Sequence, residues 1–254
     1  MNSFTIIGVT AENVADAGIC CNKDKKSPGF KAKIEWFKLK INQGLKIKLV
    51  LDERGKQIGF IEYIPSEMAW RPVNAAGYLF IHCIANLEKD SRNKNIATRL
   101  LQECENDAKL DHKSGICAMT SDGVWMANKT IFEKNGFEVA DKLGRFELMV
   151  KKFDDKNPVP RFIDWTKNLA KYKGWNLVYS DQCPWHEKSV ADLQLTAKNH
   201  GIQLHVSKLT TPQEAQLAPS GFGTFILIYD GKLLEDHYLS KTRFENILKQ
   251  QNAK

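Results

Sequence analysis

The sequence predicts a mixed α/β protein made of two domains. Its 254 residues are many for one α/β domain and comfortable for two, and the 43% hydrophobic content is enough to bury proper cores. Apolar runs typical of strands alternate along the chain with runs at helical spacing. Residues 154–160 are charged and contain two prolines, which disfavour a continuing helix. We therefore expect one domain at 1–153 and another at 161–254, joined by a linker at 154–160.

In the first domain, we expect strands where β-rich apolar residues cluster and helices where apolar residues recur every three or four positions. The chain starts with a strand and with helical stretches that reach about residue 43. Helices are predicted from Ile96 through Ala108 and at 124–134. The remaining strands are predicted at 47–52, 57–63, 78–87, 115–120, 137–143 and 145–152.

The second domain repeats this alternation over a shorter length. Its strand pair is expected to turn at Asp230 and Gly231. The predicted order is a helix at 161–171, a strand at 175–180, a helix at 187–199, a strand at 202–209, the strand pair at 224–229 and 233–239, and a final helix at 242–250. This order resembles that of thioredoxin-like folds.

The charge pattern narrows the classes of partner. A formal net charge of +7 favours anionic ligands. A cofactor with several phosphates is such a ligand, so the charge does not require a nucleic-acid partner. The basic stretch 31–48 contains an apolar helical face, so its lysines form either a solvated helix flank or a face for an acidic partner. No recognised nucleic-acid-binding pattern accompanies it, and we expect no nucleic-acid partner.

Apolar run lengths and cysteine spacing predict the compartment. No apolar stretch reaches eighteen residues, and the first ten residues lack the features of a secretory signal. The six cysteines form no Cys-x-x-Cys pair, which favours reduced thiols over disulfides or a metal site. We expect a cytoplasmic protein that is not bound to a membrane and holds no metal; its oligomeric state is open.

The most informative segment is the polar turn that joins the strand 78–87 to the helix beginning near Ile96. Backbone N–H groups at a helix N-terminus attract anions. Arg92, Asn95 and Ala97 follow the order Arg-x-x-Asn-x-Ala, which resembles the Arg/Gln-x-x-Gly-x-Gly/Ala pyrophosphate loop of GNAT N-acetyltransferases. That family binds acetyl-coenzyme A there. Asn95 stands where the family usually has glycine, and asparagine tolerates a left-handed backbone better than other non-glycine residues.

A second segment strengthens the resemblance. Residues 127–137 resemble the family's later helix and turn, Ala-x-x-x-x-Tyr-Glu-Lys-x-Gly-Phe, with Gly136 ending the helix. Over nearly its full length, to Cys183 and beyond, the chain resembles the YoaP-like acetyltransferases. The resemblance implies a GNAT acyl-CoA N-acyltransferase fold followed by a small thioredoxin-like α/β domain. It also implies acetyl-CoA as the cofactor and a small-molecule or peptide amine as the acceptor, whose identity it leaves open.

The resemblance also assigns cofactor-binding residues. Phe132 replaces the family's usual tyrosine, and phenylalanine cannot protonate the departing thiolate. Either water or another side chain protonates coenzyme A, or the thiolate leaves with little acid help. We expect Phe132 to pack on the cofactor. The residues expected to contact acetyl-CoA are Leu87, Lys89, Arg92, Asn93, Lys94, Asn95, Ile96, Ala97, Thr98, Asn128 and Phe132.

Two residues on neighbouring predicted strands, Glu62 and His82, are candidates for the general base. An imidazole titrates near neutral pH, and a desolvated carboxylate becomes basic enough to take a proton. The alternative is that His82 is a hydrogen-bonded core residue. The residues expected to bind the acceptor are Glu67, Trp70, Arg71, Cys183 and His186.

Cys183 supports an alternative function. It stands just before a predicted helix, beside Pro184 and His186, where a reactive thiolate is possible. Since it has no Cys-x-x-Cys partner, a dithiol oxidoreductase is not expected. Two interpretations stay open for this motif: ligand recognition or structure, and monothiol chemistry, thiol sensing or metal contact. In the second, the protein is a CoA-binding or thiol-dependent sensor with little acetyltransferase activity.

Overall fold

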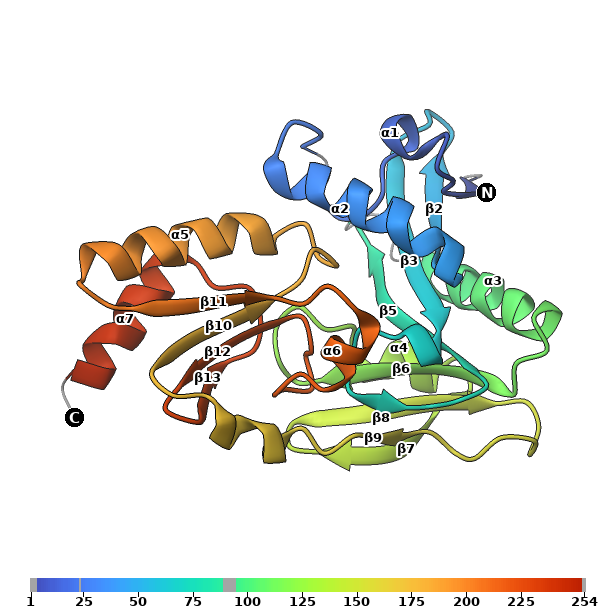
Figure 1. The fold of residues 1–254 in the computed structure, drawn as a ribbon. Coiled ribbons are helices and arrows are strands. Elements are labelled where there is room, and N and C mark those ends of the chain that lie inside the picture. Colours follow the sequence, from blue (N-terminus) through green and yellow to red (C-terminus); the bar gives the residue numbers. More distant parts are fainter. Residues whose placement is uncertain (1–3, 23, 89–94, 253–254) are drawn as a thin grey trace. The chain divides into compact units, whose positions relative to one another are not determined.

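The structure is a computed structural model that describes residues 4–22, 24–88 and 95–252 (Figure 1). The chain divides into two compact units. Unit 1 comprises Met1–Lys25, Ile34–Ala69 and Val73–Ile163. Unit 2 comprises Asp164–Lys254 and two short segments from the first half of the chain, Lys26–Lys33 and Trp70–Pro72. Helix α2 (Pro28–Lys40) therefore contributes residues to both units.

Unit 1 is built on a seven-stranded mixed sheet with the strand order β1-β2-β3-β5-β6-β8-β7. Every neighbouring pair in it is antiparallel except β5 and β6, which are parallel. The strands predicted from the sequence are confirmed with closely similar bounds. They are β1 (Phe4–Gly8), β2 (Lys46–Asp52), β3 (Gln57–Pro65), β5 (Tyr78–Asn86), β6 (Gly115–Ser121), β7 (Glu138–Leu143) and β8 (Phe146–Lys152). Short elements between them are α1 (Val14–Ala17), η1 (Ile41–Gln43), η2 (Ser66–Met68) and β4 (Val73–Asn74), which pairs with β9 (Arg161–Phe162).

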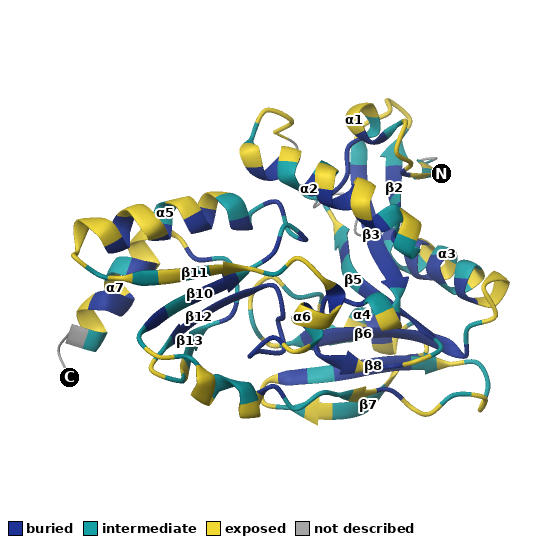
Figure 2. Ribbon diagram, in the orientation of Figure 1, coloured by how far each residue is buried: buried dark blue, intermediate teal, exposed yellow. Residues whose placement is uncertain are grey.

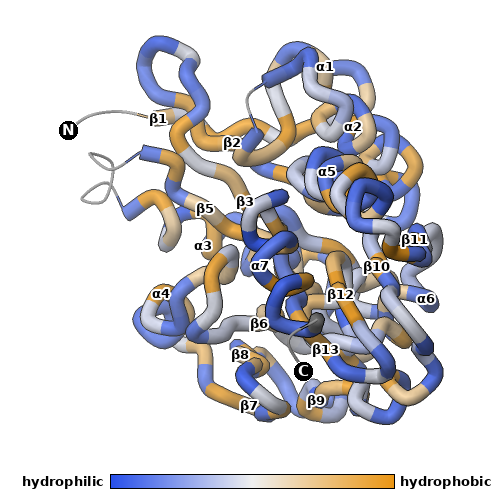
Figure 3. The backbone as a smooth tube through the Cα atoms, turned by 90° about the vertical axis from the view of Figure 1, so that its left-hand side faces the viewer, coloured by the Kyte–Doolittle hydropathy of each residue, from blue (hydrophilic) through white to orange (hydrophobic). Residues whose placement is uncertain are grey.

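The two faces of this sheet carry different side chains because successive strand residues alternate between faces. On one face, Tyr63 and Ile81 join a buried cluster with Leu100 and Cys104 of α3 (Ile96–Leu110). On the other face, the ring of His82 lies 5.6 Å from Phe80 and 6.5 Å from Trp36 of α2, between ring centroids. Figure 2 shows the central strands buried, and Figure 3 shows hydrophobic residues concentrated along them.

Strands β5 and β6 stop pairing before either of them ends. Their parallel register runs from Tyr78 opposite Gly115 to Ile81 opposite Ala118. Beyond these pairs, β5 continues to Asn86 and β6 to Ser121. The sheet of unit 1 therefore opens between the carboxyl ends of its two parallel strands.

The helix predicted at 124–134 is wrong in its first half. Helix α4 spans only Lys129–Glu133, because Asn128 caps it: the Asn128 side-chain oxygen accepts a 2.8 Å hydrogen bond from the Thr130 backbone N–H. Just upstream, Trp125 has φ of 68°, which no α-helix accommodates.

Unit 2 contains a four-stranded sheet with the order β11-β10-β12-β13. β10 pairs in parallel with β11 and antiparallel with β12, and β12 pairs antiparallel with β13. Val178, Ile226 and Ile228 lie in its buried core. Its elements are η4 (Thr166–Lys171), β10 (Trp175–Tyr179), α5 (His186–Asn199), β11 (Leu204–Lys208), α6 (Pro212–Gln216), β12 (Phe225–Tyr229), β13 (Lys232–Glu235) and α7 (Lys241–Asn252).

Two expectations for this part of the chain are corrected, and one further helix was not predicted. The helix predicted at 161–171 is instead strand β9 and the 3₁₀ helix η4, since the Asp164 carboxylate accepts the Thr166 backbone N–H at 3.1 Å and forms a polar turn. The strand predicted at 233–239 ends at Glu235, next to Asp236, which accepts a hydrogen bond from Ser220. Helix α6 was missed, although Thr211 and Glu214 form a capping box around Pro212.

Across the described ranges, no helix is both long and apolar enough to cross a membrane.

A polar network ties β2 and β3 to α3 within unit 1. Lys48 Nζ lies 2.8 Å from a Glu103 oxygen and 3.1 Å from an Asp107 oxygen, and the Tyr63 hydroxyl donates a 2.6 Å hydrogen bond to Asp107. Burial alone would raise the pKa of Asp107, but the hydrogen bonds from Tyr63 and Lys48 and the charges of Lys48 and Lys46 outweigh it, so this pKa is lowered. The ionised carboxylate therefore stabilises the fold.

We expect Tyr63→Phe to lower the free energy of unfolding at neutral pH by about 1.5–3 kcal/mol, because it removes a hydrogen bond to a charged group. A carboxylate with a lowered folded-state pKa contributes stability above its unfolded pKa, about 3.9, and loses it as the pH falls through the folded value. The deficit should therefore shrink in acid, as urea unfolding at several pH values would show. Tyr78→Phe is the matched control, because the buried Tyr78 hydroxyl has no hydrogen-bond partner among the described residues. Equal losses in both variants would contradict the assignment.

Candidate functional site

The structure brings Glu62 and His82 together as a buried pair. Glu62 lies on β3 and His82 on the adjacent strand β5, with His82 Nδ1 3.1 Å from Glu62 Oε1. Both side chains are shielded from solvent, with exposed fractions of 0% for His82 and 2% for Glu62. With Glu62 ionised, its carboxylate can only accept a hydrogen bond, so Nδ1 would carry the proton and Nε2 would be the basic nitrogen.

A β-bulge aims the imidazole. Glu62 is opposite Cys83 in the register, whereas Tyr63 is opposite Ile81, so His82 is the extra residue on β5. Such a bulge bends the strand and re-aims the side chain of the inserted residue. His82 also directly follows Ile81, the last β5 residue that pairs with β6. The Glu62–His82 pair therefore lies where the two parallel strands separate.

The start of α3 has the geometry expected for binding an anion. Asn95 adopts the left-handed conformation with φ of 52° and ψ of 30°, which confirms that the turn tolerates asparagine at this position. Asn95 makes no side-chain cap, and no acidic residue lies in the first turn. The N–H groups of Ile96, Ala97 and Thr98 therefore lie at a helix start that favours negative charge. Four predicted cofactor contacts lie outside the described residues: Lys89, Arg92, Asn93 and Lys94.

Three predicted cofactor contacts, Leu87, Asn128 and Phe132, lie outside the start of α3. The Leu87 N–H donates to the Ile58 carbonyl at 2.9 Å, so it cannot also hold a cofactor carbonyl. Asn128 is exposed and caps α4. Phe132 is 1% exposed and packs edge-to-face on Phe137, with ring centroids 5.3 Å apart. Whether Phe132 also packs on the cofactor stays a prediction.

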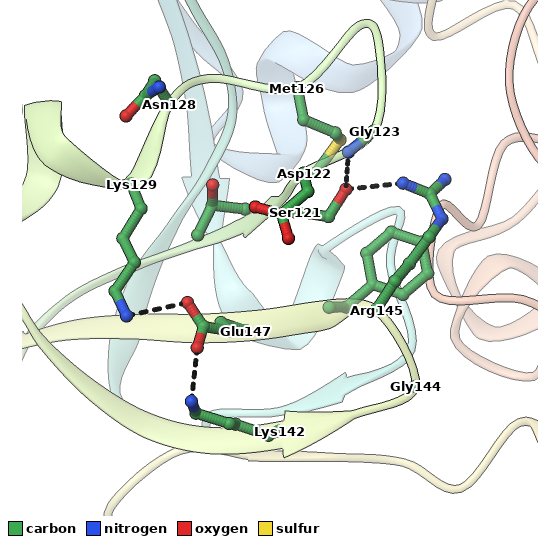
Figure 4. A pocket seen from close by; sticks show the side chains of 12 residues that line it. Ser121, Asp122, Gly123, Met126, Asn128, Lys129, Lys142, Gly144, Arg145 and Glu147 are labelled. Atoms are coloured by element: carbon green, nitrogen blue, oxygen red, sulfur yellow. Dashed lines mark hydrogen bonds and ion pairs between the residues drawn. The ribbon is translucent and has the colours of Figure 1, made fainter.

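A pocket of about 630 Å³ in unit 1 was missed by the sequence analysis (Figure 4). It begins at the end of β6 and is bounded by the loop before α4 and by the β7–β8 hairpin. Glu147 on its wall pairs with Lys129 at 2.9 Å and Lys142 at 2.6 Å, while Arg145 donates to the Ser121 hydroxyl at 2.5 Å. Of the predicted site residues that the structure describes, Asn128 alone lines it. Lys129 and Lys142 belong to no periodic sequence pattern, so nothing in the sequence indicated this pocket.

The predicted acceptor-binding residues are divided between the two units. Glu67, in unit 1, is exposed and accepts the Gly77 N–H at 2.8 Å. The other four belong to unit 2, where Trp70 and Arg71 are 0% and 4% exposed and Cys183 is half-buried. Tertiary packing buries Trp70 and Arg71, and whether these residues bind the acceptor stays a prediction.

His186 is fully buried, and its Nδ1 lies 3.0 Å from the Ser180 carbonyl oxygen, to which it donates. Burial, together with the nearby positive charges of Arg71 and Lys33, lowers the pKa of His186 to about 3. The imidazole is therefore neutral at physiological pH and gives no positive charge to a Cys183 thiolate. Within the described ranges, no group of three or more His, Cys, Asp or Glu side chains is placed to hold a metal ion.

Comparison with known proteins agrees with the resemblance. A family model described as YoaP-like matches residues 203–246. The chain is 30% identical over 248 residues to the Bacillus subtilis (strain 168) protein named uncharacterized N-acetyltransferase YoaP. The matched region covers 95% of this chain and 97% of that protein. The chain therefore belongs to the YoaP-like N-acetyltransferase family.

Solved structures with partial similarity include two acetyltransferases. A GNAT-family acetyltransferase from Staphylococcus aureus Mu50 is 15% identical with a TM-score of 0.42, over 60% of this chain and 100% of that chain. The GNAT-family N-acetyltransferase YhbS from Escherichia coli, in complex with CoA, is 13% identical with a TM-score of 0.42, over 65% of this chain and 92% of that chain.

Substitutions at Asn95 test its left-handed backbone. Asn95→Val should lower the free energy of unfolding by about 1–2 kcal/mol, because a β-branched residue is strained at positive φ, whereas Asn95→Gly should cause no such loss. Urea unfolding would measure both. Asn199→Val, at the last residue of α5, is the control that introduces the same side chain in a helix. Equal stability of the valine and glycine variants at position 95 would show that this backbone is not constrained.

Proposed function

We propose that the protein is a GNAT-type N-acetyltransferase that transfers an acetyl group from acetyl-CoA to an amine. Membership of the YoaP-like N-acetyltransferase family supports the reaction class. The observation that carries the proposal is the buried Glu62–His82 pair at the point where β5 and β6 separate. A buried base beside the point where two strands separate is suited to a reaction that must exclude water and remove a proton from a nitrogen.

Residues at the start of α3 would hold the cofactor. The left-handed Asn95 and the N–H groups of Ile96, Ala97 and Thr98 fit a diphosphate, and Arg92 would add a positive charge. When bound, acetyl-CoA supplies the reactive thioester. Within unit 1, α3 follows β5 along the chain, so the anion-binding start of α3 is connected to the strand that carries His82.

Two side chains would manage the proton. His82 Nε2 would take the proton from the acceptor amine, and the Glu62 carboxylate would hold the imidazole in one tautomer and stabilise its protonated form. Phe132 cannot return a proton to the leaving thiolate. The proposal therefore gives that step to water or to a side chain other than Phe132, and a thiolate needs less acid assistance than an alkoxide because it is less basic.

The finer assignments belong to the same proposal. We infer that unit 2 is thioredoxin-like, supported by its sheet, in which β10 has one parallel and one antiparallel neighbour. The acceptor is a small-molecule or peptide amine. A reducing, cytoplasmic location is supported by the six cysteines, which form no disulfide in the part of the chain that the structure describes. The boundary of the transferase domain near residues 154–160 stays a prediction.

Cofactor binding is tested first. Isothermal titration of acetyl-CoA should give a micromolar Kd for the wild type and at least about tenfold weaker binding for an Arg92→Ala, Asn95→Asp double variant, since losing a charge-assisted hydrogen bond costs about 1.5–3 kcal/mol. Arg54→Ala, at an exposed turn, is the control for loss of an arginine charge. Unchanged binding by the double variant would place the cofactor elsewhere, and no binding by the wild type would contradict the proposed function.

The base is tested by measuring kcat/KM against pH with a panel of primary amines. Turnover is measured as the loss of the thioester. His82→Gln should lower kcat/KM by about 10²–10⁴-fold and abolish the fall of activity in acid that comes from protonating the base. Glu62→Gln removes the negative charge that favours the protonated imidazole, so this fall should move to lower pH. His205→Gln, at an exposed position, is the matched control.

Normal turnover and pH dependence in both variants would exclude this pair as the base. Binding of acetyl-CoA without turnover of any amine would instead favour the alternative function, a CoA-binding sensor.

A further inference from the structure

The turn Ser180–His186 of unit 2 is covered by main chain from the first half of the sequence. Gly29, at the start of α2, belongs to the segment Lys26–Lys33 of unit 2. A Cβ atom at this position would overlap the Pro184 carbonyl oxygen, lie 2.9 Å from its carbonyl carbon and lie 3.4 Å from the Glu187 Cβ. Backbone therefore meets backbone here, and only glycine permits that distance.

A second close approach involves Trp70–Pro72, the other segment of unit 2 that comes from the first half of the chain. Gly223 has φ of 74°, and a Cβ there would lie 2.9 Å from the Trp70 carbonyl oxygen and 3.2 Å from the Arg71 Cα. Gly223 is followed by Thr224 and then by β12, and Pro184 is the residue after Cys183. Glycines therefore admit both segments to the main chain of unit 2.

Arg71 fastens the second segment to the same turn. Its guanidinium donates at 2.7 Å to the Trp70 carbonyl and at 3.4–3.5 Å to the side-chain oxygen of Gln182, the residue before Cys183. It also donates at 3.4 Å to the Thr224 hydroxyl and lies 5.2 Å from the centroid of the Phe222 ring. At 4% exposure such a charge is tolerated only with hydrogen-bond partners, and its removal would take a donor away from several buried acceptors.

His186 holds the turn in shape from within. Its Nδ1–H donates to the Ser180 carbonyl, and its ring lies 5.1 Å from Phe225 and 6.2 Å from Phe222, between centroids. Burial keeps the imidazole neutral, as its lowered pKa of about 3 indicates. His186 is thus a packing residue of the turn.

We propose that the Ser180–His186 turn is an internal docking site that holds Lys26–Lys33 and Trp70–Pro72, and not a thiol-exchange site. The proposal goes beyond acetyl transfer and gives unit 2 a positioning role. In the chain, Trp70–Pro72 lies between β3, which carries Glu62, and β5, which carries His82. Holding this segment limits the freedom of the connection between the two strands that carry the proposed base.

Hydrogen exchange of the full chain, read by mass spectrometry, tests the docking. Gly29→Ala should increase exchange in peptides that cover 26–33 and 180–186 by about tenfold or more, because the added methyl group forces the two backbones apart. Alanine is a better helix former than glycine, so helix propensity alone predicts slower exchange in α2. Gly8→Ala is the matched control, because nothing lies within 4 Å of a Cβ at Gly8. Unchanged or slower exchange in Gly29→Ala would overturn the docking site.

A second variant covers the case in which Gly29→Ala does not fold. Arg71→Met should increase exchange in peptides that cover 70–72 and 180–186, and Arg71→Lys should restore part of the protection, since it keeps the charge but not the geometry of the guanidinium. Equal protection in wild type and Arg71→Met would overturn the fastening role of Arg71.

Reaction with glutathione disulfide tests the exclusion of thiol exchange. If Cys183 were an exchange site, its thiolate would attack one sulfur of glutathione disulfide, forming a mixed disulfide and releasing one glutathione thiolate. We expect Cys183 in the native wild type to react at least about tenfold more slowly than in the urea-unfolded chain, and faster in Gly29→Ala than in wild type. A native rate equal to or above the unfolded rate would overturn the proposal. None of these readouts requires acetyl transfer, so failure of the proposed function leaves them decisive.

Discussion

The parallel pairing of β5 with β6 is the constraint on which the rest of unit 1 depends. Parallel neighbours cannot be joined by a hairpin, so the chain must cross over between them, and here α3 makes that crossing. The helix consequently starts just after the carboxyl end of β5, with Asn95 at its first turn. The two strands also separate at their carboxyl ends, beyond Ile81 and Ala118. One topological requirement thus brings an anion-binding helix start and an opening in the sheet to the same end of β5.

Burial of the Glu62–His82 pair, next to the point where β5 and β6 stop pairing, has an energetic cost. Removing a carboxylate and an imidazole from water is unfavourable, and a buried polar pair adds little net stability even with a good hydrogen bond. The bulge at His82 likewise interrupts a ladder that would be more regular without it. Two local departures from an optimal sheet therefore coincide at one residue. Such coincidences are expected where a protein sacrifices local consistency for a site, and they argue more strongly for function than either alone.

Sequence reasoning found the elements of this site but not its geometry. The strands of unit 1 and the helix start at Asn95 followed from apolar spacing and turn chemistry, which are local properties. Glu62 and His82 were recognisable by residue type, yet their contact depends on a register with one extra residue, which no periodicity encodes. The helix at 124–134 failed because the Asn128 cap outweighed apolar spacing. The burial of Arg71 could not be predicted from the sequence, since its partners Gln182 and Thr224 lie more than a hundred residues away along the chain.

Gly29 and Gly223 show why the second unit was hard to interpret from sequence. A glycine near the start of a helix is usually counted as a small loss of helix propensity, and a glycine before a strand as part of a turn. In the structure, each admits another backbone at a distance that excludes a methyl group. A clash between two main chains cannot be relieved by changing a side-chain rotamer. The packing is therefore specific because these two positions are glycines, which have no Cβ. The same packing explains the turn at Cys183, whose sequence suggested thiol chemistry. The Pro184 carbonyl lies against Gly29, and the Gln182 side-chain oxygen accepts a hydrogen bond from Arg71.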